Sequence, residues 1–517
     1  VDEAHNLFNS ITNGSSNAIQ LYETIIATKQ LKLFFLTGSP MQKSPFELSP
    51  CFNMLSETGV ILPENLYDFT NFFIDKDKIK NRDIFSNRIV GLTSYAGPIY
   101  HDGDPPGFPK LSPIEVIKVP MSEFQWSVYS QARTKEKEML SFGYLKAKAA
   151  RQKFGRVEVS STYRVASRQI SDFAFPAHAL VEKEHKSIKS VPSKLTEADL
   201  TTLLPTYSPK MVAILAEMDK AFAAGEDRML LFSPFVNSTI DVFARILLAR
   251  GWEEYTADAD MTDKIFDLKN TKKKFARFTG SVEPEHRAII RNHFNETNDI
   301  QLILLSEAGA EGINLLRGRL VILAAPFWYY ELIMQVIYRF YRFEGHKDLP
   351  PEKQTVRPLM FISTRPNRKM TKEETEIAKE PTTDEYLWEQ SLLGKSLIEQ
   401  FHLVLAESSI DCSVRYPTLP ITVQRRVKCK TCASTHATLF HKSVVDDLKF
   451  PNPCVIPEEK KIKVHELLVD DQKYYYQIEE GNMKIYYFDP RVRGYVIMPL
   501  DNPLYSMIHS KIIETQI

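Results

Sequence analysis

Residues 300–315 read IQLILLSEAGAEGINL, an apolar run that passes directly into a loop of small and acidic residues. Such a run is typical of a strand that is buried on both faces of a parallel sheet. Comparable strands are predicted at 229–232, 320–325 and 359–362, and helices between them at 237–250, 284–294 and 330–341. Because strands that alternate with helices imply right-handed crossovers, residues 206–365 are predicted to form a doubly wound α/β lobe.

Short polar motifs stand around this strand in one order: FTGS at 278–281, Arg287, Phe294-Asn295, PFW at 326–328 and QVIYRFYR at 335–342. Within the last motif, Gln335, Arg339 and Arg342 are spaced i, i+4 and i+7, so they are predicted to lie on one helical face. Two guanidiniums on one face suit an arginine finger, because arginine stays charged and matches phosphate oxygens. Taken singly, the glycines could be turns and the arginines a salt-bridged face. Their joint order favours a phosphate-handling site.

The chain begins with VDEAH, residues 1–5, at the start of a predicted α/β lobe that covers residues 1–118. ATP hydrolysis needs Mg²⁺ on the phosphates and an oriented water. Asp2 would hold the metal, directly or through water, and Glu3 would orient the water. A helix that begins with Asp-Glu to complement its dipole is the alternative. The run LKLFFL at 31–36, which ends at TGSP (37–40), predicts a buried parallel strand followed by a loop.

In this order the motifs resemble those of Swi/Snf-type superfamily 2 ATPases, in which the last motif has the form Q-x-x-x-R-x-x-R. The resemblance implies two RecA-like lobes, the first incomplete, that close around ATP and Mg²⁺. The site residues that it implies fall into three groups: catalytic Asp2, Glu3, His5, Gln335, Arg339 and Arg342; ATP-binding or coupling Thr37, Ser39, Gly309, Gly312 and Asn314; and nucleic-acid-binding Thr279, Gly280 and Ser306. The sequence departs from the broader superfamily at Tyr338, where glycine is usual, and at Phe340, where alanine is common.

Further segments are similar to the ATPases of large nucleocytoplasmic DNA viruses, such as the poxvirus early transcription factor small subunit and nucleoside triphosphatase I: MSEFQ at 121–125, SRQI at 167–170, residues 173–176, residues 346–352 and ESSIDC at 407–412. This resemblance implies a DNA-dependent ATPase that acts in viral transcription. The implied partners are duplex DNA, contacted without sequence specificity, and a viral RNA polymerase or transcription-factor subunit. The implied location is the virion and the viral factory in the host cytoplasm.

A phosphate-binding loop of the form G-x-x-x-x-G-K-[ST] does not occur in residues 1–517. In the family this loop precedes the acidic motif, so we expect the chain to be truncated at its N-terminus and to be inactive by itself. Two alternatives to a DNA-dependent motor remain at this point. One is a non-catalytic scaffold with a degenerate ATPase fold, and the other is a strand-unwinding helicase.

The remaining segments are predicted as a helical insertion and linker (119–205), a helical brace (366–411) and a small β-rich domain (412–517). The insertion is locally basic, which fits either a solvated helical hairpin or a phosphate-contacting surface: Lys135, Lys137, Lys146, Lys148, Arg151, Lys153 and Arg156. Residues 473–477 and 484–488 predict a β-hairpin. Cys412, Cys429, Cys432 and Cys454 could bind structural zinc, although a CxxC turn beside unrelated buried cysteines is the alternative.

Composition sets few limits on function. Lys+Arg and Asp+Glu both total 65, so a nucleic-acid surface would have to be local. Five cysteines fit a reducing compartment better than a disulfide scaffold, and Cys51 is predicted to be a core residue. No run of about 18 apolar residues occurs, so no membrane span is predicted.

Overall fold

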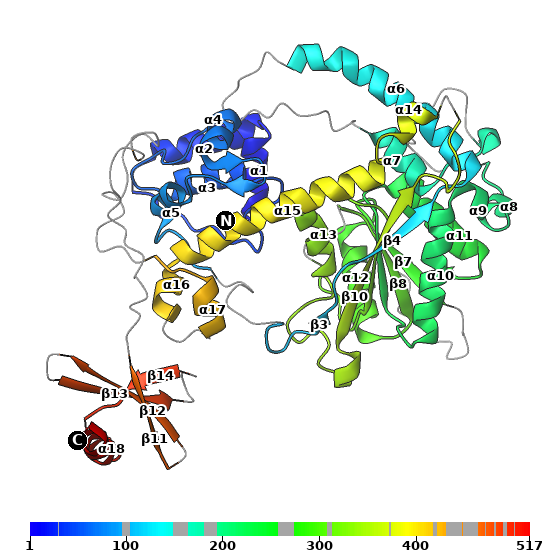
Figure 1. Ribbon diagram of the computed structural model, residues 1–517. Coiled ribbons are helices and arrows are strands. Elements are labelled where there is room, and N and C mark those ends of the chain that lie inside the picture. Colours follow the sequence, from blue (N-terminus) through cyan, green and yellow to red (C-terminus); the bar gives the residue numbers. More distant parts are fainter. Residues whose placement is uncertain are drawn as a thin grey trace. The chain divides into compact units, whose positions relative to one another are not determined.

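The computed structural model describes the chain except for residues 29, 96–103, 148–163, 180–193, 257–272, 308–312, 372–373, 417–420, 431–446, 448–463, 471, 480–481, 490–493, 501 and 517. Two compact units are present. The first contains Val1–Met54, Pro63–Lys78 and Asp104–Glu399, and the second contains Leu55–Leu62, Ile79–Gly103 and Gln400–Ile517. Both units are drawn in Figure 1.

A parallel sheet forms the centre of the first unit. Among the described residues it has eight strands: β3 (Lys110–Leu111), β4 (Glu115–Pro120), β5 (Met229–Phe232), β6 (Glu253–Glu254), β7 (Lys274–Phe278), β8 (Ile300–Leu305), β9 (Leu320–Leu323) and β10 (Thr355–Thr364). The order is β3-β10-β9-β5-β8-β7-β6, and β4 also pairs with β10. All of these pairings are parallel. The predicted doubly wound α/β lobe is therefore confirmed.

Helices cover both faces of this sheet (Figure 1). On one face lie α8 (Glu197–Leu200), α9 (Leu204–Tyr207), α10 (Pro209–Ala223) and α11 (Asp241–Ala249), which follows a π-helical turn at Val236–Ile240. On the other face lie α12 (Pro284–Glu296) and α13 (Tyr330–Ile337). Side chains of a strand alternate between the two faces. Accordingly, Leu231 packs into the first core and Leu230 into the second.

The predicted strands at 229–232 and 300–305 coincide with β5 and β8. The strand predicted at 320–325 ends at Leu323, and the one predicted at 359–362 extends over Thr355–Thr364. Strand β4 pairs with β10 and so belongs to the sheet of the second lobe. Strand β7 was not predicted, since Lys274 and Arg277 interrupt its apolar run. Both charges are paired, with Asp299 and with Glu254.

The N-terminal part of the first unit is mainly helical: α1 (His5–Thr12), α2 (Ser16–Ala27), a 3₁₀ turn at Pro45–Glu47, α3 (Leu48–Leu55), α4 (Leu66–Phe73) and the short strands β1 (Ile74–Asp75) and β2 (Lys78–Ile79). Residues 31–36 are extended but form no strand, so the predicted buried strand is wrong. Phe34 is 75% exposed and Leu36 63% exposed. The physical reason is that, among the described residues, main-chain bonds reach this segment only from Val1 and Ala4.

Two helices lie between β4 and α8 in the chain: α6 (Glu123–Ala147) and α7 (Val165–Asp172). The Ser122 hydroxyl accepts a bond from the Gln125 N–H at 3.0 Å and so caps the start of α6. Lys137 forms an ion pair with Glu380 at 2.9 Å, which favours the solvated-helix interpretation for this part. The side chains of the other basic residues, from Lys146 to Arg156, lie outside the described residues.

The second unit contains α5 (Arg82–Ile89), the end of α15 (Thr383–Ser408), α16 (Ile410–Arg415), α17 (Ile421–Arg426) and α18 (Tyr505–Gln516). α15 lies within the segment 366–411, which was predicted to be a helical brace. A meander follows: β11 (His465–Val469), β12 (Gln472–Glu479), β13 (Asn482–Asp489) and β14 (Gly494–Ile497). β12 and β13 pair antiparallel, so the predicted hairpin is confirmed. Residues of α18 pack with buried residues of these strands.

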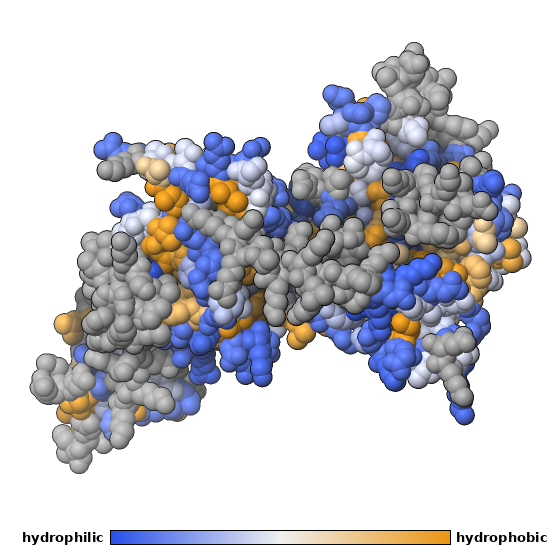
Figure 2. All heavy atoms as spheres, turned by 90° about the horizontal axis from the view of Figure 1, so that it is seen from above, coloured by the Kyte–Doolittle hydropathy of each residue, from blue (hydrophilic) through white to orange (hydrophobic). Residues whose placement is uncertain are grey.

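The surface carries polar and apolar residues together. Figure 2 shows hydrophilic residues in blue with separate orange apolar patches on the face that is drawn. Within the described ranges, no helix combines the length and the apolarity that crossing a membrane requires.

Candidate functional site

The acidic motif lies beside the extended segment 31–36. The Val1 amino group donates to the Phe34 carbonyl oxygen at 2.8 Å, and the Leu36 N–H donates to the Val1 carbonyl oxygen at 2.9 Å. The Ala4 N–H donates to the Leu36 carbonyl oxygen at 3.0 Å. These bonds place Asp2, whose side chain is exposed, at the end of an extended pair of segments.

His5 links the acidic motif to the TGS loop. Its Nδ1 lies 2.8 Å from the Thr37 hydroxyl and 3.4 Å from a Glu3 carboxylate oxygen. The same Thr37 hydroxyl accepts a bond from the Ser39 N–H at 3.1 Å. Glu3 has a φ of 46°, a left-handed conformation that is uncommon outside glycine and often marks a functional site. The sequence-predicted residues Glu3, His5, Thr37 and Ser39 therefore form one cluster.

The last motif reaches this cluster from the other half of the same unit. The Gln335 side-chain amide donates to the Ser39 hydroxyl at 3.0 Å. Burial lowers the pKa of Arg342, and the negative charge of Glu3 opposes that shift. Glu3 and Arg342 are thus within electrostatic range of each other, although 339 positions separate them in the sequence (342 minus 3).

The prediction that Gln335, Arg339 and Arg342 share one helical face is wrong, because α13 ends at Ile337. Residues 338–340 form turns. Beyond Ile337 the main-chain bonds tighten to a three-residue spacing, because the Arg339 N–H donates to the Val336 carbonyl oxygen and the Phe340 N–H to the Ile337 carbonyl oxygen, both at 3.1 Å. Phe340 itself is fully buried and stacks on Phe294 with ring centroids 6.3 Å apart.

The two arginines nevertheless converge. Nη1 of Arg339 donates to the Ile313 carbonyl oxygen at 3.3 Å, and Nη2 of Arg342 donates to the same oxygen at 3.0 Å. Nε of Arg342 also donates to the Tyr338 carbonyl oxygen at 3.0 Å. A neutral carbonyl is a weaker acceptor than a phosphate oxygen, so these guanidiniums could exchange this partner for a phosphate.

The predicted nucleic-acid-binding residues follow the carboxyl ends of β7 and β8, and the predicted coupling residue Asn314 lies farther along the chain. Thr279, buried after β7, bonds to the Ser281 hydroxyl at 2.8 Å, and Gly280 between them is exposed. Ser306 follows β8, and its buried hydroxyl has no hydrogen-bond partner. Asn314 is exposed, and its carbonyl oxygen accepts a bond from Asn295 at 2.9 Å. Gly309 and Gly312 lie outside the described residues.

Sequence reasoning did not assign roles to Asn295, Gly318 or Ile313. Asn295 holds both sides of residue 315, because its Oδ1 also accepts a bond from the Leu316 N–H at 2.8 Å. A Cβ at Gly318 would overlap the Phe340 ring. Asn295 belongs to the Phe294-Asn295 motif, so its role could have been predicted from the sequence. The role of Ile313 could not, because it depends on a main-chain carbonyl oxygen, which every residue has.

Asp2 is chemically suited to Mg²⁺. One of its oxygens accepts the Glu3 N–H at 2.9 Å, and the side chain is exposed. In the described part of the chain, no group of three or more His, Cys, Asp or Glu residues could enclose a metal. The exposed Asp2 carboxylate fits Mg²⁺, which is usually held by one or two carboxylates together with substrate phosphates.

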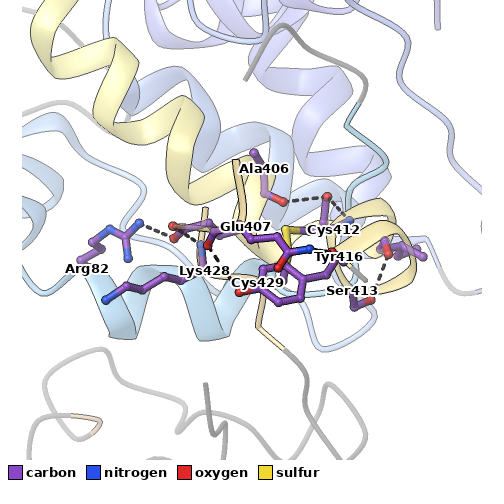
Figure 3. Close-up of a disulfide and its surroundings, with 11 residues drawn as sticks. Arg82, Ala406, Glu407, Cys412, Ser413, Tyr416, Lys428 and Cys429 are labelled. Atoms are coloured by element: carbon purple, nitrogen blue, oxygen red, sulfur yellow. Dashed lines mark hydrogen bonds and ion pairs between the residues drawn. A yellow bond between two sulfur atoms is a disulfide. The ribbon is translucent and has the colours of Figure 1, made fainter. Parts of the chain in front are cut away.

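The predicted zinc site is corrected by a disulfide in the second unit. Cys412 and Cys429 are bonded to each other, with their Cα atoms 5.3 Å apart (Figure 3). Cys412 lies in α16, and Cys429 follows α17. A disulfide removes both thiolates as zinc ligands. Cys432 and Cys454 lie outside the described residues. The expectation that this cysteine set would contain no disulfide is therefore also wrong, whereas Cys51 is free and buried, as predicted.

Glu407 binds the segment that carries this disulfide. Its carboxylate accepts bonds from the Lys428 N–H at 2.9 Å and from the Arg82 guanidinium (Figure 3). The Ser409 hydroxyl donates to the Ala406 carbonyl oxygen at 2.8 Å and caps α16. The segment ESSIDC is thus a structural junction of this unit, not a metal centre.

Comparisons with known proteins agree with the motif order. Residues 213–344 match the helicase conserved C-terminal domain. The termination factor NPH-I homolog of African swine fever virus is 30% identical over an alignment that covers 98% of this chain and 75% of that protein. The chain belongs to the NPH-I termination factor family.

Other relatives of this NPH-I-family chain are more distant. A protein of Acanthamoeba polyphaga mimivirus described as an ATP-dependent RNA helicase is 27% identical over 72% of this chain and 61% of its own length. The solved C-terminal part of the Fun30 ATPase domain matches with 16% identity and a TM-score of 0.33, over 57% of this chain and 99% of that one. The predicted resemblance to superfamily 2 and to viral ATPases is confirmed.

Proposed function

We propose that this NPH-I-family chain supplies the hydrolytic half of a DNA-stimulated ATPase. The observation that carries the proposal is the link from the last motif to the acidic motif: Gln335 bonds to Ser39, and Arg342 lies within electrostatic range of Glu3. Carboxylates for the metal and water, together with guanidiniums for the phosphoryl group, are the parts that phosphoryl transfer requires.

In this proposal each residue has one role. Asp2 would hold Mg²⁺, which would supply positive charge to offset the charge of the phosphates. Glu3 orients the attacking water, and His5 keeps Glu3 beside Thr37. Arg339 and Arg342 leave the Ile313 carbonyl oxygen for the phosphate oxygens, where charge develops in the transition state. Gln335 bonds to the Ser39 hydroxyl and so links the arginine motif to the TGS loop.

The proposed cycle converts nucleotide state into movement on DNA. ATP binding favours closure of the two lobes and hydrolysis releases it, so the chain translocates stepwise. Duplex DNA is held mainly by phosphate contacts, so binding has little sequence preference and depends steeply on salt. By analogy with the termination factor relative, the partner is a viral RNA polymerase or transcription factor. The place of action is the virion and the viral factory in the host cytoplasm.

The 517 residues contain no phosphate-binding glycine loop, and this sets the direct test. We expect the chain alone to bind ATP weakly and to turn it over negligibly. A version that carries such a loop upstream of Val1 should hydrolyse ATP and respond to duplex DNA. A steady-state assay in which the chain alone shows normal DNA-stimulated turnover would refute this expectation.

A second candidate is a non-catalytic scaffold with the same fold. The absence of the glycine loop and the presence of Tyr338 in place of glycine favour it. The clustered Glu3, His5 and Ser39 favour the ATPase instead, because a scaffold has no need of them. Strand displacement, measured beside ATPase activity on duplex and single-stranded DNA, distinguishes a translocase from an unwinding helicase. A loop-bearing version without any turnover would support the scaffold.

A further inference from the structure

Arg168 in α7 has a buried guanidinium that forms no hydrogen bond with any residue in the described part of the chain. The residue is 6% exposed, and its Nε and Nη2 atoms are buried with no acceptor. Buried donors in native proteins are almost always paired, and an unpaired one is costly. Such an exception needs an explanation, and a ligand that accepts from the free donors is one.

The fold places this guanidinium where open α/β sheets bind ligands. Its Cζ lies 4.7 Å from the ring centroid of Phe235, which follows β5, and 5.7 Å from that of Phe327, which follows β9. β5 and β9 are adjacent in the sheet. The chain continues from β5 to β6 at one edge of the sheet, and from β9 to β10 on the opposite side. Connections that leave adjacent strands in opposite directions create a crevice at the carboxyl ends of those strands, and ligands bind there.

Two more groups at this edge of the sheet share the same property. The hydroxyl of Ser306, which follows β8 beside β5, is buried and has no partner. The hydroxyl of Ser238, three residues after Phe235, is also buried without a partner. Arg164, which directly precedes α7, places its guanidinium 3.8 Å from the ring centroid of Tyr386. Cationic and hydroxyl donors therefore gather on one edge of the sheet.

The nearby carboxylates do not hold Arg168 by a hydrogen bond. Asp172 and Asp384 are both bonded to the buried Lys210, at 2.8 and 2.7 Å. Asp172 also accepts a bond from the Thr239 hydroxyl at 2.6 Å. Glu307 is exposed, and its negative charge interacts with the positive charge of Arg168.

We propose that Arg168, together with Ser306, binds a backbone phosphate of a nucleic-acid strand that runs across the carboxyl edge of this sheet. The proposal rests on the proposed nucleic-acid-stimulated ATPase and adds a contact from α7, outside the lobe motifs. Phosphate fits because a guanidinium offers several donors in a planar fork and hydroxyls add neutral donors. No base contact is involved, so this site contributes affinity without sequence preference.

The test is the salt dependence of binding to a short fluorescent duplex, measured by anisotropy with the 517-residue chain. Between about 50 and 200 mM salt, loss of one phosphate contact should reduce the slope of log K against log salt by about 0.9. We expect this reduction and about fivefold to tenfold weaker binding for Arg168→Met. Arg168→Lys keeps the charge and should keep the slope. Arg250→Met is the matched control, because Arg250 follows α11 and is paired on the surface with Asp219 at 3.1 Å.

A second variant keeps the proposal testable if Arg168→Met unfolds. Glu307→Gln removes a negative charge near the phosphate and should tighten binding about threefold at the lowest salt. If folded Arg168→Met and Glu307→Gln both bind as the unmodified chain does, Arg168 only balances Asp172 and Asp384, and the inference is overturned. If the unmodified chain itself does not bind the duplex, the proposed function fails instead. A lower melting temperature for Arg168→Met with an unchanged slope also assigns the residue to stability.

Discussion

Two apolar runs of this chain, residues 300–305 and 31–36, end in opposite environments. The first is β8, and Leu302, Ile303, Leu304 and Leu305 are completely buried. β8 has a parallel neighbour on each side, β5 and β7. In the second run Phe34 is 75% exposed and Leu36 63% exposed, and the described residues bond to it along one edge only.

This difference shows what an apolar run predicts and what it does not. The same kind of local pattern predicted a buried strand in both runs, but only residues 300–305 form one. Burial depends on neighbours from elsewhere in the chain, and only β8 receives them on both edges and both faces. The exposed run is still positioned, because its main-chain bonds to Val1 and Ala4 place the acidic motif beside Thr37. A segment can therefore organise a site without forming a core.

The largest expected effect concerns Arg342. This residue belongs to the well-packed α/β lobe and interacts electrostatically with Glu3 of the acidic motif. In a version with a phosphate-binding loop, Arg342→Ala should reduce ATP turnover by about 10³-fold or more, because an arginine finger contributes on that order. Binding to duplex DNA should change little. Arg250→Ala, on the surface of the same lobe, is the control for the loss of one positive charge. Turnover near that of the unmodified enzyme would reject the arginine-finger assignment.

Substitution of one leucine in each run tests whether residues 300–305 are buried and residues 31–36 exposed. Leu304→Ala should lower the free energy of unfolding by about 2–5 kcal/mol, since it leaves a cavity in a fully buried strand. Leu36→Ala should change it by no more than about 0.5 kcal/mol, because that side chain is 63% exposed. Urea denaturation of both variants provides the measurement. Equal losses would show that residues 31–36 are buried in solution.

The sequence predicted the parts of the fold that depend on local pattern. β5 and β8 have the predicted bounds because uninterrupted apolar residues form them. β7 escaped detection, since the partners of its charged residues come from distant positions, Asp299 for Lys274 and Glu254 for Arg277. In the site, the convergence of Arg339 and Arg342 was predicted, but the end of α13 was not. After Ile337 the main-chain bonds tighten to a three-residue spacing, and the apolar spacing of Val336, Ile337 and Phe340, which suits a continued helix, does not reveal this change.

Two glycines sharpen the contrast between the regions further. A Cβ at Gly318 would overlap the buried ring of Phe340, whereas a Cβ at Gly38 would meet no atom within 4 Å. We expect Gly318→Ala to lower the free energy of unfolding by about 1–3 kcal/mol through overpacking. Gly38→Ala should stay within about 0.5 kcal/mol of the unmodified chain. Thermal unfolding compares the two, and a tolerated Gly318→Ala would mean that Phe340 has an alternative position.

The smallest expected effect tests the bond that joins the two regions, from Gln335 to Ser39. Ser39→Ala, Gln335→Ala and the double variant form a double-mutant cycle in the free energy of unfolding. A neutral, partly buried hydrogen bond should give a coupling energy of about 0.5–1.5 kcal/mol. Thr24→Ala combined with Gln335→Ala is a suitable control, because the Thr24 hydroxyl bonds within its own helix to the Gln20 carbonyl oxygen. Additive effects for Ser39 and Gln335 would mean that this bond does not hold the regions together. The exposed run would then be positioned by its main-chain bonds alone, and closure of the site would depend on nucleotide.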